Sequence, residues 1–127
     1  MNGTDDGTDD GGRPWLEVCA SQALADGGDG VRFEWPDPRR GGAPMAAFAV
    51  RHRGRVYAFL NRCAHVPVEL DWQPGKFFDD SGLYLICATH GAVYQPASGR
   101  CIAGPCRGAH LYALNCDEHD GMVRVQI

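Results

Sequence analysis

Two cysteine–histidine pairs constrain the fold of this chain more than any other feature. The first pair is Cys63 and His65, and the second is Cys87 and His90. Twenty-one residues separate the two pairs, which is enough for two loops to approach each other from one side of a sheet. Two thiolates and two imidazoles together make a complete ligand set for a metal site. We therefore expect a fold that brings these two segments together.

The rest of the chain consists of short apolar runs broken by Gly, Pro and Asp. These runs predict strands at residues 15–19, 31–35, 45–51, 55–60, 83–87, 92–95, 111–115 and 122–127. Residues 47–61 predict a hairpin that turns near Gly54, and residues 112–127 predict a second one that closes at Asp120-Gly121. No segment combines a sustained helical period with helix caps. The pattern indicates an all-β sandwich or small barrel.

The length of 127 residues suits one compact domain. Residues 1–12 are acidic and Gly-rich and hold no hydrophobic residue after Met1, so they predict a disordered tail before a single domain at residues 13–127. The formal net charge of −4 comes from four aspartates in that tail. The remaining residues carry equal numbers of acidic and basic side chains, which gives no reason to expect a nucleic-acid partner.

The sequence shows neither an export signal nor a membrane span. Its N-terminus lacks a basic region followed by an apolar region, and its longest apolar stretch, residues 43–50, is far too short to cross a bilayer. We therefore expect a soluble, cytoplasmic protein without a membrane partner. In a reducing compartment, the six cysteines indicate metal binding rather than a disulfide framework.

Ligand counting alone leaves two kinds of metal site open. Zinc accepts two cysteines and two histidines in a tetrahedral structural site. A Rieske-type [2Fe–2S] cluster takes the same set, with both cysteines on one iron and both histidines on the other. Both sites remain compatible with the four residues.

The residues around the two pairs resemble the Rieske [2Fe–2S] family. The matching pattern runs through Cys63, His65, Cys87, His90, Gly91, Tyr94, Gly99, Gly104 and Pro105, and the resemblance extends over about residues 15–127. It implies a Rieske-type antiparallel β-sandwich with a small cluster-binding subdomain carried on two loops, at about residues 61–95. It also implies a cover loop at about residues 101–108. The implied cofactor is one [2Fe–2S] cluster, ligated by the two Cys–His pairs.

The resemblance also assigns roles to three residues near the ligands. Gly91 lets the backbone come close to the cluster, where amide groups can point at sulfide. Tyr94 stands where related proteins place a tyrosine that can donate a hydrogen bond to a cysteine sulfur. Pro105 stiffens the loop that covers the cluster and limits the access of water.

Differences from the high-potential respiratory members of the family indicate the reduction potential of the cluster. Those proteins carry two further cysteines that form a disulfide beside the cluster, and a serine that bonds a bridging sulfide. The corresponding positions here are Val68, Thr89 and Ala92. We expect a reduction potential in the lower part of the Rieske range, about −150 to 0 mV.

The other cysteines and histidines lack the spacing of metal ligands. We interpret Cys101 and Cys106, on either side of the Gly-Pro of the cover loop, as two free thiols rather than a disulfide. Cys19 and Cys116 are interpreted as small core residues. We treat the remaining histidines as structural: His52, His110 and His119.

The apolar residues Val66, Pro67 and Val68 directly follow the ligand His65. We interpret them as an apolar rim where a redox partner docks briefly. The implied function is that of a one-electron carrier, not itself an enzyme, between a reductase, plausibly flavin-dependent, and a terminal oxidoreductase such as an oxygenase. Two alternatives remain at this point: a small subunit of a larger redox enzyme, and a zinc-stabilised interaction module.

Overall fold

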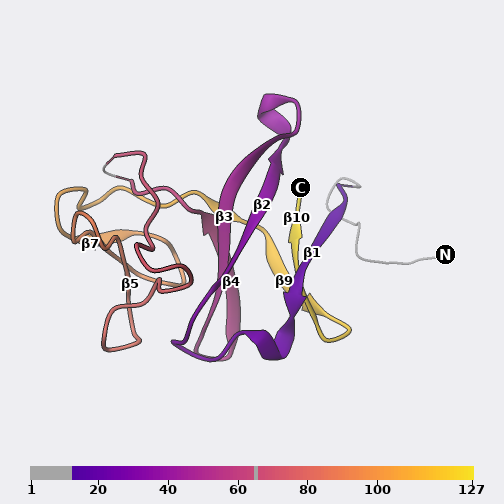
Figure 1. Cartoon of the computed structure of the whole chain (residues 1–127), viewed down its shortest axis with the longest axis horizontal. Helices are drawn as coiled ribbons and strands as arrows, with labels where there is room; N and C mark the ends of the chain where they lie inside the picture. The colour runs from indigo at the N-terminus through magenta and orange to yellow at the C-terminus, as the bar shows by residue number, and fades with distance from the viewer. Residues whose placement is uncertain (1–12, 65) are drawn as a thin grey trace.

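Figure 1 shows the protein as a computed structural model, which describes residues 13–64 and 66–127. The strands of these residues form three antiparallel sheets. Sheet A holds, in spatial order, β1 (Trp15–Ala20), β10 (Met122–Gln126) and β9 (Cys116–His119). Sheet B holds β2 (Val31–Asp37), β3 (Ala43–His52), β4 (Arg55–Leu60) and β8 (Ala113–Leu114). Sheet C holds β5 (Leu85–Ile86), β6 (Val93–Tyr94) and β7 (Cys101–Ala103).

The prediction of an all-β fold is confirmed. Within the described residues the only helices are single 3₁₀ turns, η2 (Ser21–Ala23) and η3 (Pro38–Arg40). No helix in this part of the chain has the length and apolarity to cross a membrane. The predicted tail at residues 1–12 and the predicted ligand His65 lie outside the described residues.

Each predicted strand is found, but those of sheet C and β8 are shorter than expected. The strands predicted at residues 83–87, 92–95 and 111–115 shrink to two-residue β5, β6 and β8, because loops take over on either side of them. β7 was missed, and β9 was predicted only as part of the second hairpin and not as a strand of its own. The edge strand β9 pairs with β10 alone and reads Cys-Asp-Glu-His, with its last two residues exposed, so it shows no apolar alternation.

Both predicted hairpins are found, and their turns explain why they form. In the first, His52 pairs with Arg55 across the residues Arg53-Gly54, whose φ angles are 51° and 80°. In the second, Met122 pairs with His119 across the two residues 120 and 121, with φ angles of 52° and 76°. Two-residue hairpin turns of this kind need positive φ at both positions, which Asp-Gly supplies readily.

Sheet B lies between two hydrophobic cores. Figure 1 shows sheet A on one side of it and sheet C with its long loops on the other. Along β3, Ala47 and Ala49 pack into the core shared with sheet A, whereas Phe48 and Val50 pack into the core shared with sheet C. This alternation follows the two-residue period of a strand. The small side chains of Ala47 and Ala49 therefore face sheet A, while Phe48 and Val50 support the region that carries the Cys–His pairs.

Two polar contacts tie sheets A and B together. The indole Nε1 of Trp35 on β2 donates a hydrogen bond of 2.9 Å to the carbonyl oxygen of Gln126 on β10. The guanidinium of Arg51 on β3 forms a two-pronged ion pair with Glu118 on β9, with Nη2–Oε2 2.6 Å and Nη1–Oε1 3.1 Å. The same guanidinium also donates to the carbonyl oxygens of Ser21 and Leu24. These contacts fix the relative position of the two sheets.

Candidate metal centre

Three of the four sequence-predicted ligands meet at one end of the molecule. Cys63 follows β4, Cys87 directly follows β5, and His90 lies three residues further on. Their ligand atoms all lie within 4.8 Å of one another. Both cysteines are buried and His90 is half-buried, with its Nδ1 3.7 Å from Cys87 Sγ. The two loops therefore converge as a metal site requires.

The first loop is closed at its base by Asn61. Its side-chain Oδ1 accepts a hydrogen bond of 2.8 Å from the backbone N–H of Leu70, and its Nδ2 donates one of 2.9 Å to Asp71 Oδ1. Within the loop, the N–H of Cys63 donates to the carbonyl oxygen of Val68 at 2.7 Å. The side chain of Asn61 thus joins both ends of the segment that presents Cys63.

Asp71 is the second polar residue that orders this loop. It is only 5% exposed, and its Oδ2 accepts from the N–H of Gly75 at 2.9 Å and lies 3.2 Å from Arg32 Nε. Sequence reasoning missed both Asn61 and Asp71. A signal existed in the position of Asn61, a polar residue at the end of an apolar strand and two residues before a ligand. A buried carboxylate with several donors holds its loop rigidly.

The second loop turns tightly between its two ligands. The N–H of Cys87 donates to the carbonyl oxygen of Ala92, and the N–H of Gly91 donates back to that of Cys87, both at 2.8 Å. Gly91 has a φ of 71°, which side-chain-bearing residues rarely adopt, while a Cβ added there would meet no described atom within 4 Å. Backbone conformation therefore explains this glycine without any crowding. The two loops are joined where Ala88 N–H donates to Leu70 O at 3.0 Å.

Tyr94 connects the strand β6 to the first ligand loop. Its hydroxyl oxygen lies 3.3 Å from Cys63 Sγ and accepts a hydrogen bond of 3.0 Å from the N–H of Ala64. The side chain is completely buried, and burial raises the pKa of Tyr94 far above its usual range. The hydroxyl therefore keeps its proton, which it can donate to a thiolate sulfur.

The predicted cover loop packs on the second ligand loop through Gly104. A Cβ at Gly104 would lie 2.9 Å from Ala92 Cα and 3.0 Å from Gly91 O, so no larger residue fits there. Pro105, which follows, is exposed. The close contact of the cover loop is thus made by the glycine of the Gly-Pro pair.

The residues predicted to form the docking rim lie at the surface beside the site. Val66 is half-buried, Pro67 is exposed, and Val68 is 37% exposed. The structure thus places apolar side chains in contact with solvent immediately after the position of His65.

Two of the other cysteines, Cys19 and Cys116, and the three other histidines lie apart from this cluster. Cys19 and Cys116 are half-buried and pack against the core between sheets A and B. The ring of His52 lies 6.3 Å from that of Phe78, and His119 Nε2 lies 3.2 Å from Asp120. His110 makes a backbone bridge with Arg100. None of these joins the described group of metal-ligating side chains.

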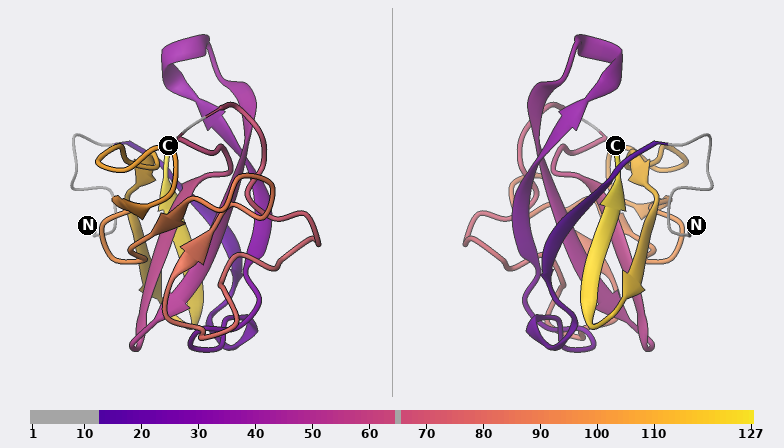
Figure 2. Two further views of the ribbon diagram at one scale, coloured as in Figure 1. Left: turned by 90° about the vertical axis from the view of Figure 1, so that its left-hand side faces the viewer. Right: turned by 90° about the vertical axis from the view of Figure 1, so that its right-hand side faces the viewer.

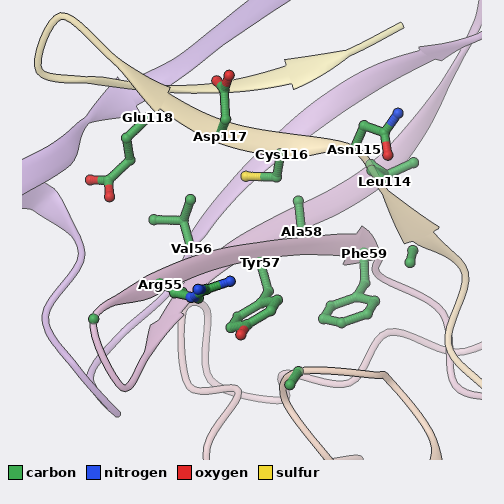
Figure 3. A pocket seen from close by; sticks show the side chains of 13 residues that line it. Arg55, Val56, Tyr57, Ala58, Phe59, Leu114, Asn115, Cys116, Asp117 and Glu118 are labelled. Atoms are coloured by element: carbon green, nitrogen blue, oxygen red, sulfur yellow. The ribbon is translucent and has the colours of Figure 1, made fainter. Parts of the chain in front are cut away.

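A cavity of about 480 Å³ lies away from the candidate metal centre, between β4 and the segment β8–β9. Figure 3 shows Val56 and Ala58 pointing from β4 towards β9, whereas Tyr57 and Phe59 point to the opposite face. Cys116 lies on the β9 wall of the cavity, where burial raises the pKa of its thiol to about 12. A thiol with so high a pKa stays protonated near neutral pH and is a poor nucleophile there.

The donor set fits a thiolate- and imidazole-bound cofactor. Burial raises the pKa of the Cys87 thiol, so the thiol loses its proton only when a cation replaces it. Nitrogen and sulfur donors are those preferred by zinc and by iron–sulfur clusters. Fold and site together define a small all-β domain whose metal centre is carried on two loops.

Comparison with known proteins identifies the family. Residues 14–121 match the Rieske [2Fe-2S] domain, and the chain belongs to this family. The cofactor is therefore a Rieske-type [2Fe–2S] cluster, which decides between the two metals that ligand counting left open. No curated protein sequence matches the chain.

Several solved structures share the fold. The ferredoxin of Sphingomonas yanoikuyae B1 superposes with a TM-score of 0.70 at 22% identity, over 90% of this chain and 99% of that chain. A chain in the reduced complex between oxygenase and ferredoxin in carbazole 1,9a-dioxygenase has a TM-score of 0.71 at 18% identity, over 89% of this chain. The terminal oxygenase of carbazole 1,9a-dioxygenase from Novosphingobium sp. KA1 has a TM-score of 0.71 at 22% identity, also over 89% of this chain. The present chain spans 28% and 29% of the length of these two dioxygenase chains.

Proposed function

We propose that this protein is a one-electron carrier whose cluster is held by Cys63 and Cys87 on one iron and by His65 and His90 on the other. The observation that carries the proposal is the convergence of Cys63, Cys87 and His90 within 4.8 Å. When bound, a Rieske cluster takes up and releases a single electron. In the sequence, His65 directly follows Ala64, so it can supply the fourth ligand of this set.

The cysteine side and the histidine side of the site differ in how deeply they are buried. Cys63 and Cys87 are 3% and 0% exposed, which keeps water from the thiolates. His90 is half-buried, and its neighbours Thr89 and Gly91 are exposed. We infer that electrons enter and leave at the histidine side, because that side is the more exposed of the two.

The apolar rim of Val66, Pro67 and Val68 suits a short-lived contact with such a partner. Two of its three residues are exposed, so a partner can cover them at little cost of desolvation. A small, largely apolar patch of this kind favours the weak, quickly exchanging complexes of electron-transfer proteins. The rim is therefore our candidate docking site.

The partners that we propose are a reductase, plausibly flavin-dependent, and a terminal oxygenase, in the cytoplasm. The support is the shared fold of two kinds of relative: a free-standing ferredoxin that this chain matches along 99% of its length, and complexes of oxygenase with ferredoxin in carbazole 1,9a-dioxygenase. The same domain also forms 28% of a longer chain in such a complex. That observation supports a second candidate, a small Rieske-fold subunit of a larger redox enzyme.

We further propose the division of the chain into a cluster-binding subdomain at about residues 61–95, with a cover loop at about residues 101–108. The closure of residues 61–71 by Asn61 and Asp71 supports the first part. The packing of Gly104 on Ala92 supports the second, although the cover loop begins within β7.

The test begins with the purified protein. We expect a red-brown colour, iron and inorganic sulfide in equal amounts, and an EPR signal of low average g value on reduction. A midpoint potential of about −150 to 0 mV is expected, because Val68, Thr89 and Ala92 provide neither the disulfide nor the serine hydroxyl of high-potential members of the family. Zinc without iron, or a midpoint near the upper limit of the Rieske range at about +300 mV, would contradict the proposal.

Variants then test the ligands and the rim separately. Cys87→Ser and His90→Cys are expected to lose or alter the cluster. Val68→Lys is expected to retain the cluster and its potential but to slow electron transfer to an oxygenase. Leu83→Lys is the matched control, since Leu83 is also exposed, at 48%, but lies by the 79–82 turn. Equal slowing by both variants would contradict a docking role for the rim.

A further inference from the structure

A second pair of sulfur atoms lies beside the proposed cluster site. Cys101 on β7 and Cys106 on the following loop are not disulfide-bonded, and their Sγ atoms are 2.9 Å apart. We propose that Cys101 and Cys106 form a reversible dithiol–disulfide couple, a second redox site that exchanges two electrons and adjusts the cluster through Tyr94. The adjustment, but not the couple itself, rests on the proposed role of Cys63 as a ligand.

The backbone already holds the two cysteines in position for a disulfide. Ala109 N–H donates to Cys106 O at 2.8 Å, Cys101 N–H donates to Ala109 O at 2.8 Å, and Gly108 N–H donates to Cys101 O at 2.9 Å. These bonds close the loop back onto β7. A disulfide bond is about 2.05 Å long, so the sulfurs need to approach by only about 0.9 Å. Little further ordering of the chain is needed.

Access for a small oxidant is provided at Cys106, the more exposed of the two thiols, and a cavity lies beside Cys101. The cavity has a volume of about 230 Å³ and is lined by Cys101 together with exposed residues that include Arg100 and Arg107. Cys106 is 8% exposed and Cys101 is fully buried. A hydroperoxide can reach this pair, whereas the surface of another protein cannot. Burial raises the pKa of the Cys101 thiol, so this thiol stays protonated near neutral pH.

The chemistry needs one hydroperoxide for each pair. The Cys106 sulfur attacks one oxygen of the peroxide, the O–O bond breaks, and an alcohol leaves with the thiol proton, or water in the case of hydrogen peroxide. The resulting sulfenic acid is attacked by the Cys101 sulfur, the S–S bond forms, and water leaves with the second thiol proton. Two thiols have then lost two electrons and two protons. A small dithiol reverses the change by thiol–disulfide exchange.

Tyr94 links this pair to the cluster. Its hydroxyl oxygen lies 3.3 Å from both Cys63 Sγ and Cys106 Sγ, so its single proton can be donated to only one of the two sulfurs at a time. Cys106 S–H donates to Cys101 Sγ, which leaves the Cys106 sulfur as an acceptor. In the disulfide, that sulfur moves towards Cys101 and accepts more weakly. The Tyr94 proton then goes to Cys63, and a hydrogen bond to a cluster sulfur raises the reduction potential.

The couple is tested on the purified holoprotein. The two cysteines lie on one tryptic peptide, residues 101–107, between Arg100 and Arg107. After hydrogen peroxide treatment and alkylation, we expect this peptide to carry no alkyl group and to be lighter than the free dithiol peptide by two hydrogen atoms, and we expect prior treatment with dithiothreitol to restore alkylation at both cysteines. Cys101→Ser is the control, in which Cys106 is expected to gain oxygen instead. A peptide that stays fully alkylated, or that gains oxygen in the unsubstituted protein, would overturn the couple.

The link to the cluster has its own readout. We expect the midpoint potential to rise when the disulfide forms, and we expect Tyr94→Phe to abolish the rise while residues 101–107 still oxidise. An unchanged or lowered potential would overturn the link. The peptide assay needs no cluster, so failure of the couple and failure of the proposed ligand set give different results.

Discussion

The two ends of this molecule are held together in different ways. We call sheets A and B the base and the region from Asn61 to Leu111, with sheet C, the tip; Figure 2 shows the tip in front of sheet B in its left-hand view. In the base, β2 and β3 pair over seven residues and β3 and β4 over six. In the tip, β5, β6 and β7 pair over two residues each. Strand pairing therefore supports the base far more than the tip.

The tip replaces strand pairing with side-chain hydrogen bonds to backbone. Asn61, Asp71 and Tyr94 each bond a backbone N–H of the loops. Its core also relies on Phe77, which stacks on Phe48 of β3 with ring centroids 4.0 Å apart. Because the tip holds fewer strand-to-strand hydrogen bonds than the base, the bound cluster contributes a larger share of the stability of the tip. Four predictions test this difference.

The largest effect is expected from removing the cofactor. Stripping iron with a chelator and a reductant is expected to speed amide hydrogen exchange in residues 61–111 by at least about tenfold, while β3 and β4 stay protected. Mass-detected hydrogen exchange on both forms measures this. Uniform loss of protection over the whole chain would show that base and tip do not differ in this respect.

The next effect is expected at the aromatic contact between base and tip. Phe48→Ala is expected to lower the free energy of unfolding by about 3–5 kcal/mol and to release the cluster at lower urea concentration, because a completely buried ring is lost. Val125→Ala, in the core between sheets A and B, is the control and is expected to lower stability without early cluster loss. Urea titration with far-ultraviolet and visible detection compares them. If the Val125→Ala variant also released its cluster at lower urea concentration, the two cores would not differ in their support of the cluster, and the prediction would be wrong.

A smaller effect is expected from the polar network of the first loop. Asn61→Ala leaves the Leu70 N–H and the Asp71 carboxylate short of a partner, so we expect a loss of about 1–3 kcal/mol. Hydrogen exchange is expected to rise chiefly in residues 61–75. Ser98→Ala, on an exposed turn, serves as the control. A loss for Asn61→Ala no larger than that for the control would refute the proposed role of the network.

The smallest effect is expected in the base, at the ion pair of Arg51 and Glu118. The hydrogen bonds from Arg51 hold the pKa of Glu118 below its usual range, so the pair stabilises the fold above the unfolded pKa of about 4.3. This stabilisation is lost as the pH falls through the lower folded pKa. Glu118→Gln is expected to cost about 0.5–1 kcal/mol near neutral pH and progressively less below about pH 4. Thermal unfolding of both proteins, measured from neutral pH to below about pH 4, checks this prediction. A stability cost of Glu118→Gln that does not change with pH would contradict it.

Sequence reasoning was most successful where local chemistry decides the structure. The turn at Asp120-Gly121 follows from residues that tolerate positive φ, and β4 matches its predicted bounds because its apolar run is bounded by Gly54 and Asn61. The all-β class followed from the same apolar runs. The Rieske family was recognisable because ligands, glycines and a tyrosine recur at fixed spacing.

What the sequence could not supply depends on contacts between distant residues. The strands of sheet C are short because loop hydrogen bonds such as Ala88 to Leu70 replace the ladder, and no local pattern encodes such a bond. The pairing of Asn61 with Asp71 and the 2.9 Å approach of Cys101 and Cys106 arise only when the loops close.

The sequence by itself thus determined the class of fold, the family and its cofactor, because ligand types and turn residues act through their own chemistry. The tertiary structure decided how two cores share one sheet and how Tyr94 comes to lie between two sulfur sites. These arrangements depend on packing and hydrogen bonds between residues far apart in the chain, which no short stretch of sequence contains.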